Sequence, residues 1–407
     1  MLIEDKEQLS KEYKKLLKLK LKLDLTRGRP SVTQLDLSNK LEGILKRNFT
    51  QDNIEIRNYG HIDGLPSAKK LAGYILGSDP KNILVNGTSS LTLLGHYIQS
   101  LIFKGSGSSP WKDLNKVTIL CPVPGYDRHF SLLEQLGIRM IPLPLTGKGP
   151  DLNIVEDLIN SDDSVRGILC VPKNSNPTGE TYTKEVLESL AKLAKSSNED
   201  FKVIFDNAYA VHDFDKSKKL PNIEKIFIDA EAHDHLVMFG STSKITLAGS
   251  GLGFLSLSPN NMKHFQSYFS KLTLGADKVN QARHARLFKN KKDLQLHMQK
   301  LAKLIKPKFD LVQKYLENLP EGLGEWTVPT GGYFVSFNSK PGRASRIYSL
   351  CENAGLKLTP LGSTFPYGKD LDDKNIRIAP TQIDDQSLKK AMELFCLCVK
   401  LAETDYS

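Results

Sequence analysis

Lys244 is the residue whose place in the chain most needs a chemical explanation. It lies in the stretch MFGSTSKITLAGSGLGFLSLS, residues 238–258, where an apolar run typical of a buried strand ends at Ser-Thr-Ser-Lys. Gly249, Gly251 and Gly253 follow, and glycines allow a backbone to come close to a ligand. A lysine there is either an ordinary surface charge or an amine nucleophile, whose pKa burial or neighbouring groups would lower.

Polar or aromatic residues also follow four other apolar runs. Each run is rich in Val, Ile, Leu or Phe and ends in Gly, Pro, Asn or Asp, as buried parallel strands do. The residues concerned are Gly87, Thr88 and Ser89 after KNILV, Tyr126 after KVTILCPV, Asn176 after VRGILCV, Asp206 and Tyr209 after FKVIF, and Ser241 in the run before Lys244. Because ligands of open α/β sheets bind beyond the carboxyl ends of the strands, we expect these side chains to converge on one crevice.

Taken singly, these residues also have ordinary structural explanations. Ser89 and Asp206 would serve as helix N-caps, because their side-chain oxygens accept hydrogen bonds from free N–H groups. The Asn-Pro-Thr-Gly sequence at 176–179 is a common turn before a helix, and an aromatic such as Tyr126 after Pro-Gly is often simple packing. Their joint occurrence at successive strand ends is what favours a shared site.

The order of the strands and helices expected around these residues predicts an α/β fold. From about residue 65, apolar extended runs alternate with helical stretches such as EVLESLAKLAKSS, which indicates a mostly parallel sheet covered on both faces. After about residue 290 the pattern changes to long charged helices followed by WTVPTGGYFVSFN and NIRIAP, which indicates a smaller α+β domain. We expect an N-terminal arm and part of the small domain in 1–50, a large domain in 51–290, and the rest of the small domain in 291–407.

Composition excludes several other classes of protein. The 407 residues are 40% hydrophobic and 25% charged, which is an ordinary globular composition. The sequence contains no run of about 18 apolar residues, so we expect no membrane span. The acidic N-terminus does not resemble a secretory signal, and five scattered cysteines without a CxxC pair indicate reduced thiols in the cytoplasm. The net charge of +10 is compatible with nucleic acid, but no zinc or RNA-recognition pattern supports it, so we expect solvated helix faces, no nucleic-acid partner and no metal.

Four motifs in a fixed order give the chain a family resemblance. NSNPTG, FDNAY and STSK, followed by IRIAP more than a hundred residues later, resemble the fold-type I pyridoxal-phosphate enzymes, and above all the class I aminotransferases. Within that class, LTRGRPSVTQLDLS, STSKITLAGSG and DKVNQARH are similar to the bacterial subgroup Ic aspartate aminotransferases. The resemblance implies a large domain with a mostly parallel seven-stranded sheet between helices, and a smaller α+β domain built from both termini.

The resemblance assigns roles to the residues around the cofactor ring. Lys244 would form the Schiff base with pyridoxal 5′-phosphate and later move the Cα proton. Asp206 would bond the pyridinium nitrogen and keep it protonated, so that the ring acts as an electron sink. Tyr209 and Asn176 match the residues that bond the cofactor's O3′ oxygen, and Tyr126 matches the aromatic that stacks on the ring.

The cofactor phosphate would lie at the start of the helix that follows Gly87, Thr88 and Ser89. Free N–H groups, hydroxyls and the helix dipole favour an anion there, and Ser241 would add a further donor. Tyr59 resembles the tyrosine that reaches the phosphate of the neighbouring subunit and takes part in catalysis. This implies a homodimer with shared active sites.

Substrate binding is assigned by the same resemblance to Arg377, Asn176 and Gly28. The guanidinium of Arg377 in NIRIAP would hold the substrate α-carboxylate bidentately, as a lysine could not. The chain departs from many family members because the loop after Lys244 has no arginine for the phosphate, and its expected position falls at or beside Gly251. Arg27, Arg29, Arg283 and Arg286 are the candidates to replace it, and a residue near Arg283 or Arg29 would bind a distal substrate carboxylate.

The expected activity is pyridoxal-phosphate-dependent transamination between an amino acid, aspartate by resemblance, and a 2-oxo acid, 2-oxoglutarate. Two alternatives remain open on these residues. The same scaffold supports aminotransferases for aromatic or neutral amino acids and C–S β-lyases. It also occurs in regulators without catalytic activity, although only some 25 residues precede LTRGRP, fewer than the about 50 that a DNA-binding domain needs.

Overall fold

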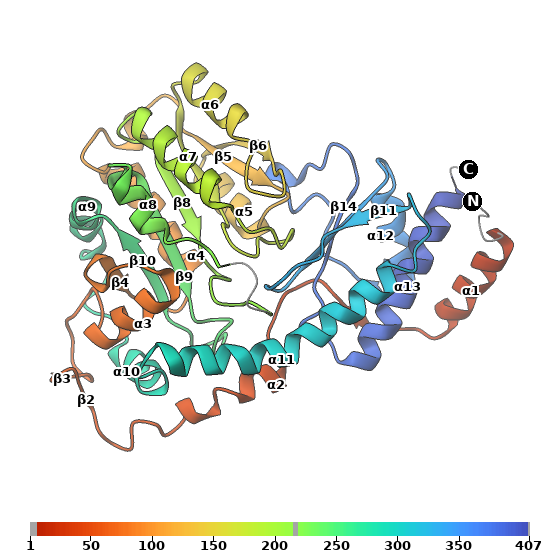
Figure 1. Cartoon of the computed structure of the whole chain (residues 1–407), viewed down its shortest axis with the longest axis horizontal. Helices are drawn as coiled ribbons and strands as arrows, with labels where there is room; N and C mark the ends of the chain where they lie inside the picture. The colour runs from red at the N-terminus through yellow and green to blue at the C-terminus, as the bar shows by residue number, and fades with distance from the viewer. Residues whose placement is uncertain (1–5, 215–218, 406–407) are drawn as a thin grey trace.

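The computed structural model describes residues 6–214 and 219–405 and contains one large twisted sheet. The sheet order is β4-β10-β9-β8-β7-β5-β6 (Figure 1), and all strands run parallel except β10, which is antiparallel to both neighbours. The strands are β4 (Ile83–Val85), β5 (Thr118–Val123), β6 (Arg139–Pro144), β7 (Val165–Cys170), β8 (Lys202–Asp206), β9 (Leu236–Ser241) and β10 (Gly253–Leu257). The expected mostly parallel seven-stranded sheet is confirmed.

Strand β10 occupies residues that the sequence indicated only as the end of a glycine-rich loop. The loop after Lys244 turns the chain back, so that Gly253 pairs with Ser241 in the antiparallel ladder. A Cβ on Gly253 would lie 2.8 Å from the carbonyl oxygen of Ser89, and one on Gly240 would lie 2.3 Å from the ring of Phe254. These glycines therefore let β10 lie close to β9 and to the N-terminus of the helix Ser90–Lys104.

Both faces of the sheet are buried under helices, which explains the continuous apolar runs. Successive strand residues alternate between two hydrophobic clusters: Val203 belongs to one face and Ile204 to the other. The helices over the Val203 face are α3 (Pro66–Leu76), α6 (Leu152–Ser161), α7 (Lys184–Ser196), α8 (Ile223–Asp229) and α10 (Lys278–Leu287). Those over the Ile204 face are α4 (Ser90–Lys104), α5 (Asp127–Gln135) and α9 (Pro259–Phe269).

A second sheet and its helices form the other part of the molecule, on the right of Figure 1. Its antiparallel strands have the order β11-β12-β14, and the long helix α11 runs from the large sheet's side toward it. The elements are α11 (Lys291–Leu316), β11 (Gly324–Trp326), β12 (Val335–Ser339), α12 (Ala344–Asn353), β13 (Leu356–Lys357), β14 (Asn375–Ile378) and α13 (Asp385–Thr404).

The N-terminal segment packs on this second part. Helix α1 (Lys6–Lys18) donates hydrogen bonds from Lys6 Nζ to the Thr404 carbonyl at 3.1 Å and from the Tyr13 hydroxyl to the Leu350 carbonyl at 2.7 Å. Strand β1 (Leu23–Asp24) pairs in parallel with β13. We therefore propose the division 1–50, 51–290 and 291–407, of which residues 1–5, 215–218 and 406–407 lie outside the described part.

The remaining elements are short. Helix α2 (Val32–Asp36) follows β1, and the hairpin of β2 (Thr50–Gln51) and β3 (Ile54–Glu55) stands at the lower left of Figure 1. Short 3₁₀ helices lie at Asn39–Leu41, Pro80–Asn82, Trp111–Asp113, His233–His235 and Pro366–Gly368. Among residues 6–214 and 219–405, no helix combines the length and apolar character that crossing a membrane requires.

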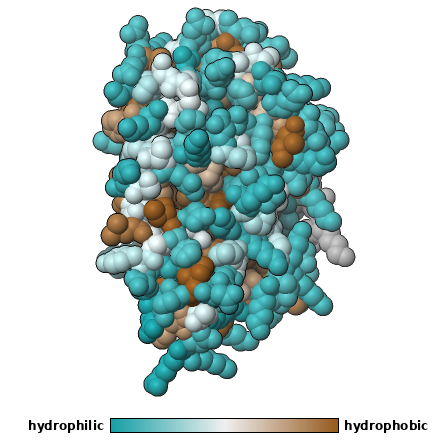
Figure 2. All heavy atoms as spheres, turned by 90° about the vertical axis from the view of Figure 1, so that its left-hand side faces the viewer, coloured by the Kyte–Doolittle hydropathy of each residue, from teal (hydrophilic) through white to brown (hydrophobic). Residues whose placement is uncertain are grey.

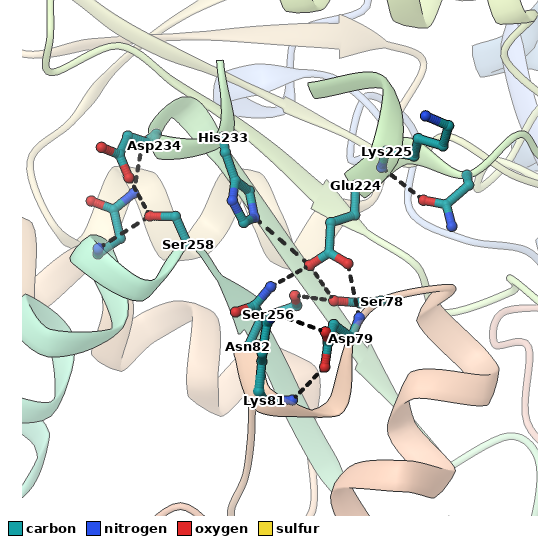
Figure 3. A network of polar contacts seen from close by, with 12 residues as sticks. Ser78, Asp79, Lys81, Asn82, Glu224, Lys225, His233, Asp234, Ser256 and Ser258 are labelled. Atoms are coloured by element: carbon teal, nitrogen blue, oxygen red, sulfur yellow. Dashed lines mark hydrogen bonds and ion pairs between the residues drawn. The ribbon is translucent and has the colours of Figure 1, made fainter. Parts of the chain in front are cut away.

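The buried carboxylate of Glu224 connects α8 to the 3₁₀ helices Pro80–Asn82 and His233–His235, on the face of the large sheet that carries Val203 (Figure 3). Glu224, at the start of α8, accepts hydrogen bonds from the Ser78 hydroxyl at 2.7 Å, the Asp79 N–H at 2.8 Å and the Asn82 amide at 3.0 Å. His233 Nε2 lies 3.7 Å from the same carboxylate. Burial alone raises the pKa of Glu224, but these donors outweigh it and lower that pKa to about 2.

Replacing Glu224 by glutamine should lower the free energy of unfolding at pH 7 by about 1–3 kcal/mol, because charge-assisted hydrogen bonds are lost inside the fold. The folded-state pKa lies below that of the unfolded chain, so the carboxylate stabilises the fold fully above pH 4.5, and this stabilisation falls as the pH drops toward 2. Urea unfolding at several pH values should show the difference between the two proteins narrowing as the medium becomes acidic.

Glu188→Gln is a matched control for this measurement. Glu188 pairs with Lys184 on the surface of α7, where its side chain is 44% exposed. The control should change the unfolding free energy by less than about 0.5 kcal/mol. An equal effect of the two substitutions, or one at Glu224 that does not depend on pH, would contradict the role given to the buried carboxylate.

Candidate active site

A cavity of about 190 Å³ lies at the carboxyl ends of the central strands. Seven of the residues singled out in the sequence line it: Ser89, Tyr126, Asn176, Asp206, Tyr209, Ser241 and Lys244. Ser90, Leu91, Val171, Ala208 and Ser243 complete the lining. The strand ends therefore bring these residues together, as the parallel sheet predicts.

Lys244 lines this cavity from the turn after β9. Its Nζ lies 4.9 Å from the centroid of the Tyr209 ring, within cation–π distance. Burial lowers the pKa of the Lys244 amine, the nearby Asp206 carboxylate opposes this, and the Arg377 cation adds to it. An amine with a lowered pKa is more often neutral near pH 7, which is the state that a nucleophile or general base requires.

Two buried side chains hold the main chain of Lys244. His212 Nε2 lies 3.2 Å from the Lys244 carbonyl oxygen, and the Tyr333 hydroxyl lies 3.4 Å from the same oxygen. Burial lowers the pKa of His212 to about 3, so this histidine is neutral and donates from Nε2. The Tyr333 hydroxyl also contacts Gln34 Oε1 at 3.0 Å, which connects Lys244 to the N-terminal segment. Sequence reasoning did not identify His212 or Tyr333, because their partner is a backbone atom.

Asp206 is buried at the end of β8 with one oxygen paired and one not. Its Oδ2 lies 2.9 Å from His129 Nε2, and both side chains are at most 5% exposed. Its Oδ1 is buried without a hydrogen-bond partner among the described residues. Since an unsatisfied buried carboxylate oxygen is costly, this atom is suited to a protonated donor on a ligand in the cavity.

His129 is a site residue that the sequence reasoning missed. It lies on α5, three positions after Tyr126, and the two rings meet edge to face with centroids 4.9 Å apart. Residues three positions apart at the start of a helix lie on the same face, and this spacing is the signal in the sequence that pairs His129 with Tyr126. Burial, with help from the Asp206 and Asp127 carboxylates, raises the pKa of Tyr126 to about 12, so its ring stays neutral.

Hydroxyl groups gather at the N-terminus of α4. Ser89 caps the helix by accepting the Leu91 N–H at 3.2 Å. Ser241 and Ser243 share a hydrogen bond of 2.6 Å, and both hydroxyls contact the Thr88 carbonyl. The free N–H groups of the helix and these hydroxyls form a region suited to an anion. Gly87 and Thr88, which the sequence singled out, are not among the residues that line the cavity, whereas Ser243 is.

Lys244 is the only cationic side chain among the residues that line the cavity. Arg283 lines a different cavity, beside Ser250 and Asn280. Arg286 donates to the Leu45 and Thr50 carbonyls. The structure therefore gives no support to Arg283 or Arg286 as a substitute for the missing loop arginine within one chain, and the lining does not include Arg27 or Arg29 either.

Arg377 lies next to the cavity, on β14 of the small sheet. It contacts Asn176 Oδ1 from Nη1 at 3.2 Å and lies over the Phe334 ring, 4.8 Å from its centroid. Gly28 packs on the same ring, because a Cβ there would lie 2.5 Å from Phe334 Cζ. The structure thus places Arg377, Asn176 and Gly28 together. Tyr59, in contrast, lies outside the cavity with 79% of its surface exposed.

No group of three or more His, Cys, Asp or Glu side chains suited to a metal ion occurs among the described residues. The reactive groups of the cavity are instead a buried amine, a buried carboxylate and a cluster of hydroxyls. Such a set can hold an anionic, aromatic ligand with a protonated ring nitrogen and bring an amine to it.

Comparisons with known proteins agree over nearly the whole chain. A family model described as aspartate amino-transferase matches residues 2–407. An aspartate aminotransferase of Corynebacterium glutamicum is 39% identical over 407 residues, covering 98% of this chain and 94% of that protein. The crystal structure of an aspartate transaminase from the same species has a TM-score of 0.95 at 37% identity, covering 98% of this chain and 96% of that chain.

A more distant structure shows the same fold. The α-aminoadipate aminotransferase from Thermus thermophilus, complexed with N-(5′-phosphopyridoxyl)-L-leucine, has a TM-score of 0.79 at 18% identity. The superposition covers 97% of this chain and 95% of that chain. The fold-type I architecture expected from the sequence is therefore confirmed.

Replacing His129 by phenylalanine should remove the partner of Asp206 Oδ2, so that neither oxygen of this buried carboxylate has a hydrogen bond from a protein side chain. We expect the free energy of unfolding to fall by about 2–3 kcal/mol in urea titrations. His235→Phe is the control, because its Nδ1 contacts the Phe201 carbonyl and no carboxylate, among the residues that the structure describes, and it should cost about 1 kcal/mol. Adding Asp206→Asn to His129→Phe should recover part of the loss, and no recovery would contradict the explanation by an unsatisfied buried carboxylate.

Proposed function

This chain belongs to the aspartate amino-transferase family, and we propose that it transfers an amino group between aspartate and 2-oxoglutarate with pyridoxal 5′-phosphate as its cofactor. The observation that carries the cofactor proposal is the unpaired, buried Oδ1 of Asp206, which lines the same cavity as Lys244. A pyridinium N–H is a donor that satisfies this oxygen, and an aldehyde is the group that a primary amine binds.

The residues around the cavity fit the remaining parts of the cofactor. Its phosphate would lie at the N-terminus of α4, among the hydroxyls of Ser89, Ser241 and Ser243. Its ring would lie against Tyr126, with Asn176 and Tyr209 near O3′. The complex of the Thermus thermophilus protein with a phosphopyridoxyl amino acid supports such a ligand in this fold.

The bound cofactor would supply an aldehyde that forms a covalent link with amines and a ring that withdraws electrons. Lys244 Nζ would hold the cofactor covalently at rest and, once released by the incoming amino acid, would take the proton from the substrate Cα. Its lowered pKa favours the neutral amine that accepts this proton. Asp206 would keep the ring nitrogen protonated, and His129 would orient Asp206.

Arg377 is the residue that we propose for the substrate α-carboxylate. Its guanidinium can donate two parallel hydrogen bonds to a carboxylate. The contact with Asn176 places it at the edge of the cavity. Aspartate is proposed as the amino donor because the Corynebacterium glutamicum relative carries that name.

We further propose a homodimer in which Tyr59 reaches the partner's site. Tyr59 is 79% exposed, and Leu274 and Leu272, 72% and 50% exposed, lie near it because the Gly60 N–H donates to the Leu274 carbonyl. Figure 2, which faces the side of the molecule that carries the β2–β3 hairpin, shows hydrophobic side chains exposed among hydrophilic ones. The buried Lys278 ammonium donates to the Asn58 and Gly60 carbonyls and fixes this loop to α10.

A cytoplasmic location is proposed from the cysteines. All five are free and buried, which suits a reducing compartment.

Sodium borohydride treatment of the purified holoprotein, followed by digestion and mass spectrometry, should place a pyridoxyl group on the peptide that contains Lys244. Lys244→Ala should abolish both this label and turnover, because no other lysine lines the cavity. Lys173→Ala is the control: Lys173 is buried but pairs with Asp213 at 2.8 Å, so the label should remain on Lys244. A label on another lysine would refute the assignment.

A screen of the proteinogenic amino acids with 2-oxoglutarate should show the fastest glutamate formation from aspartate. The reason is the family membership together with the relative's name. The measurement is glutamate and 2-oxo acid formed at equal amino acid concentrations, with Lys244→Ala as the blank. Faster turnover of aromatic or neutral amino acids, or pyruvate and ammonia from cysteine derivatives, would overturn the aspartate proposal without affecting the cofactor.

A further inference from the structure

The guanidinium of Arg377 already has four hydrogen-bond acceptors within the chain. Nε donates to the Thr359 hydroxyl at 3.1 Å, and Nη2 donates to the Thr26 carbonyl at 3.3 Å. Nη1 donates to Asn176 Oδ1 at 3.2 Å and to Asp127 Oδ1 at 3.0 Å. A guanidinium has five N–H bonds, so a single N–H, on Nη2, remains for a ligand.

One N–H cannot bind a carboxylate bidentately. That geometry needs two N–H groups pointing in the same direction from adjacent nitrogens. The proposed substrate carboxylate must therefore displace one of the present acceptors, or bind Arg377 through a single, weaker bond.

Asp127 is the acceptor best suited to be displaced. Its side chain is 28% exposed, whereas Thr359 and Asn176 are buried and Thr26 contributes a main-chain carbonyl. Water can solvate a carboxylate that leaves, but it cannot reach the buried acceptors. Asp127 is also the only acceptor with a negative charge, so a second carboxylate on the same guanidinium would repel it.

The position of Asp127 in the fold links this ion pair to the cavity. Asp127 is the first residue of α5 and follows Tyr126, which lines the cavity. Arg377 reaches it from β14 of the small sheet, so the ion pair joins the two parts of the molecule. The pair also compensates the charge of a guanidinium that is only 5% exposed, which would otherwise be buried alone.

We propose that Asp127 is a specificity-determining residue that takes the place of the substrate carboxylate at Arg377 until an amino acid or 2-oxo acid displaces it. This inference rests on the proposed function, because it takes Arg377 as the carboxylate-binding residue. An attached carboxylate competes at a high effective concentration. Small anions that offer nothing but a negative charge are thus excluded from Arg377. A substrate that also reacts through its amino or keto group gains enough binding free energy to displace Asp127.

The test measures binding of acetate, a carboxylate without an amino or keto group, to the purified holoprotein at constant ionic strength. The line width of the carboxyl signal of carbon-13-labelled acetate gives the dissociation constant. Asp127→Asn should bind acetate about tenfold more tightly than the unchanged protein, because a charge-assisted competitor becomes a neutral one. Asp127→Ala, with its melting temperature recorded, is a second variant in case the amide disturbs α5.

Asp162→Asn is the matched control. Asp162 pairs with Arg139 at 2.8 Å and its side chain is 26% exposed, so this change removes the same charge from a similar ion pair elsewhere. It should leave the acetate affinity unchanged. Adding Arg377→Lys to Asp127→Asn should abolish the gain, which would locate the acetate at Arg377.

Equal or weaker acetate binding by both folded Asp127 variants would overturn the inference, because Asp127 would then support the site rather than compete for it. An equal gain in Asp162→Asn would also overturn it, since the effect would be one of net charge. The borohydride label on Lys244 separates this outcome from a failure of the proposed function. A missing label refutes the cofactor whatever the acetate result, and a present label with unchanged acetate binding refutes only the role of Asp127.

Discussion

Asp206 presents a buried carboxylate at the carboxyl end of the central strand β8, and the surrounding site compensates for it. A carboxylate in an apolar interior is destabilising unless donors satisfy its oxygens. His129 contacts Oδ2, whereas Oδ1 is buried without a hydrogen-bond partner among the described residues. The Lys244 amine lies in the same cavity, where burial lowers its pKa while the Asp206 charge opposes that shift. Acid and amine are therefore held near each other without a direct ion pair, which leaves both available to a ligand.

The glycines around Lys244 serve backbone packing. Gly253 begins β10, and a Cβ there would meet the main chain of Ser89, so its absence lets β10 and the start of α4 approach each other. The hydroxyls of Ser241 and Ser243 thereby reach the Thr88 carbonyl beside the helix N-terminus. A close backbone approach is thus what assembles the proposed phosphate region.

Arg377 connects three segments that are far apart in the chain. Its contacts with Thr26, Asp127 and Asn176 bring together the N-terminal segment, α5 of the large sheet and the loop after β7. Because the guanidinium is buried, each of these hydrogen bonds contributes more to the stability of the fold than a hydrogen bond at the surface would. Through these contacts Arg377, the residue proposed for the substrate carboxylate, also holds the small sheet against the large one.

The sequence by itself determined the fold class, the family and most of the cavity. Continuous apolar runs indicated buried parallel strands, and the polar residues at their ends, such as Asp206 and Lys244, had to meet because parallel strands end at one edge. It did not determine β10 as a strand, His129 as the partner of Asp206, or His212 as a support of Lys244. These depend on pairs of atoms brought together from distant segments, or on backbone acceptors, and neither leaves a periodic pattern in the chain. Only the tertiary structure decided that Asp127 and Arg377, 250 positions apart, form an ion pair.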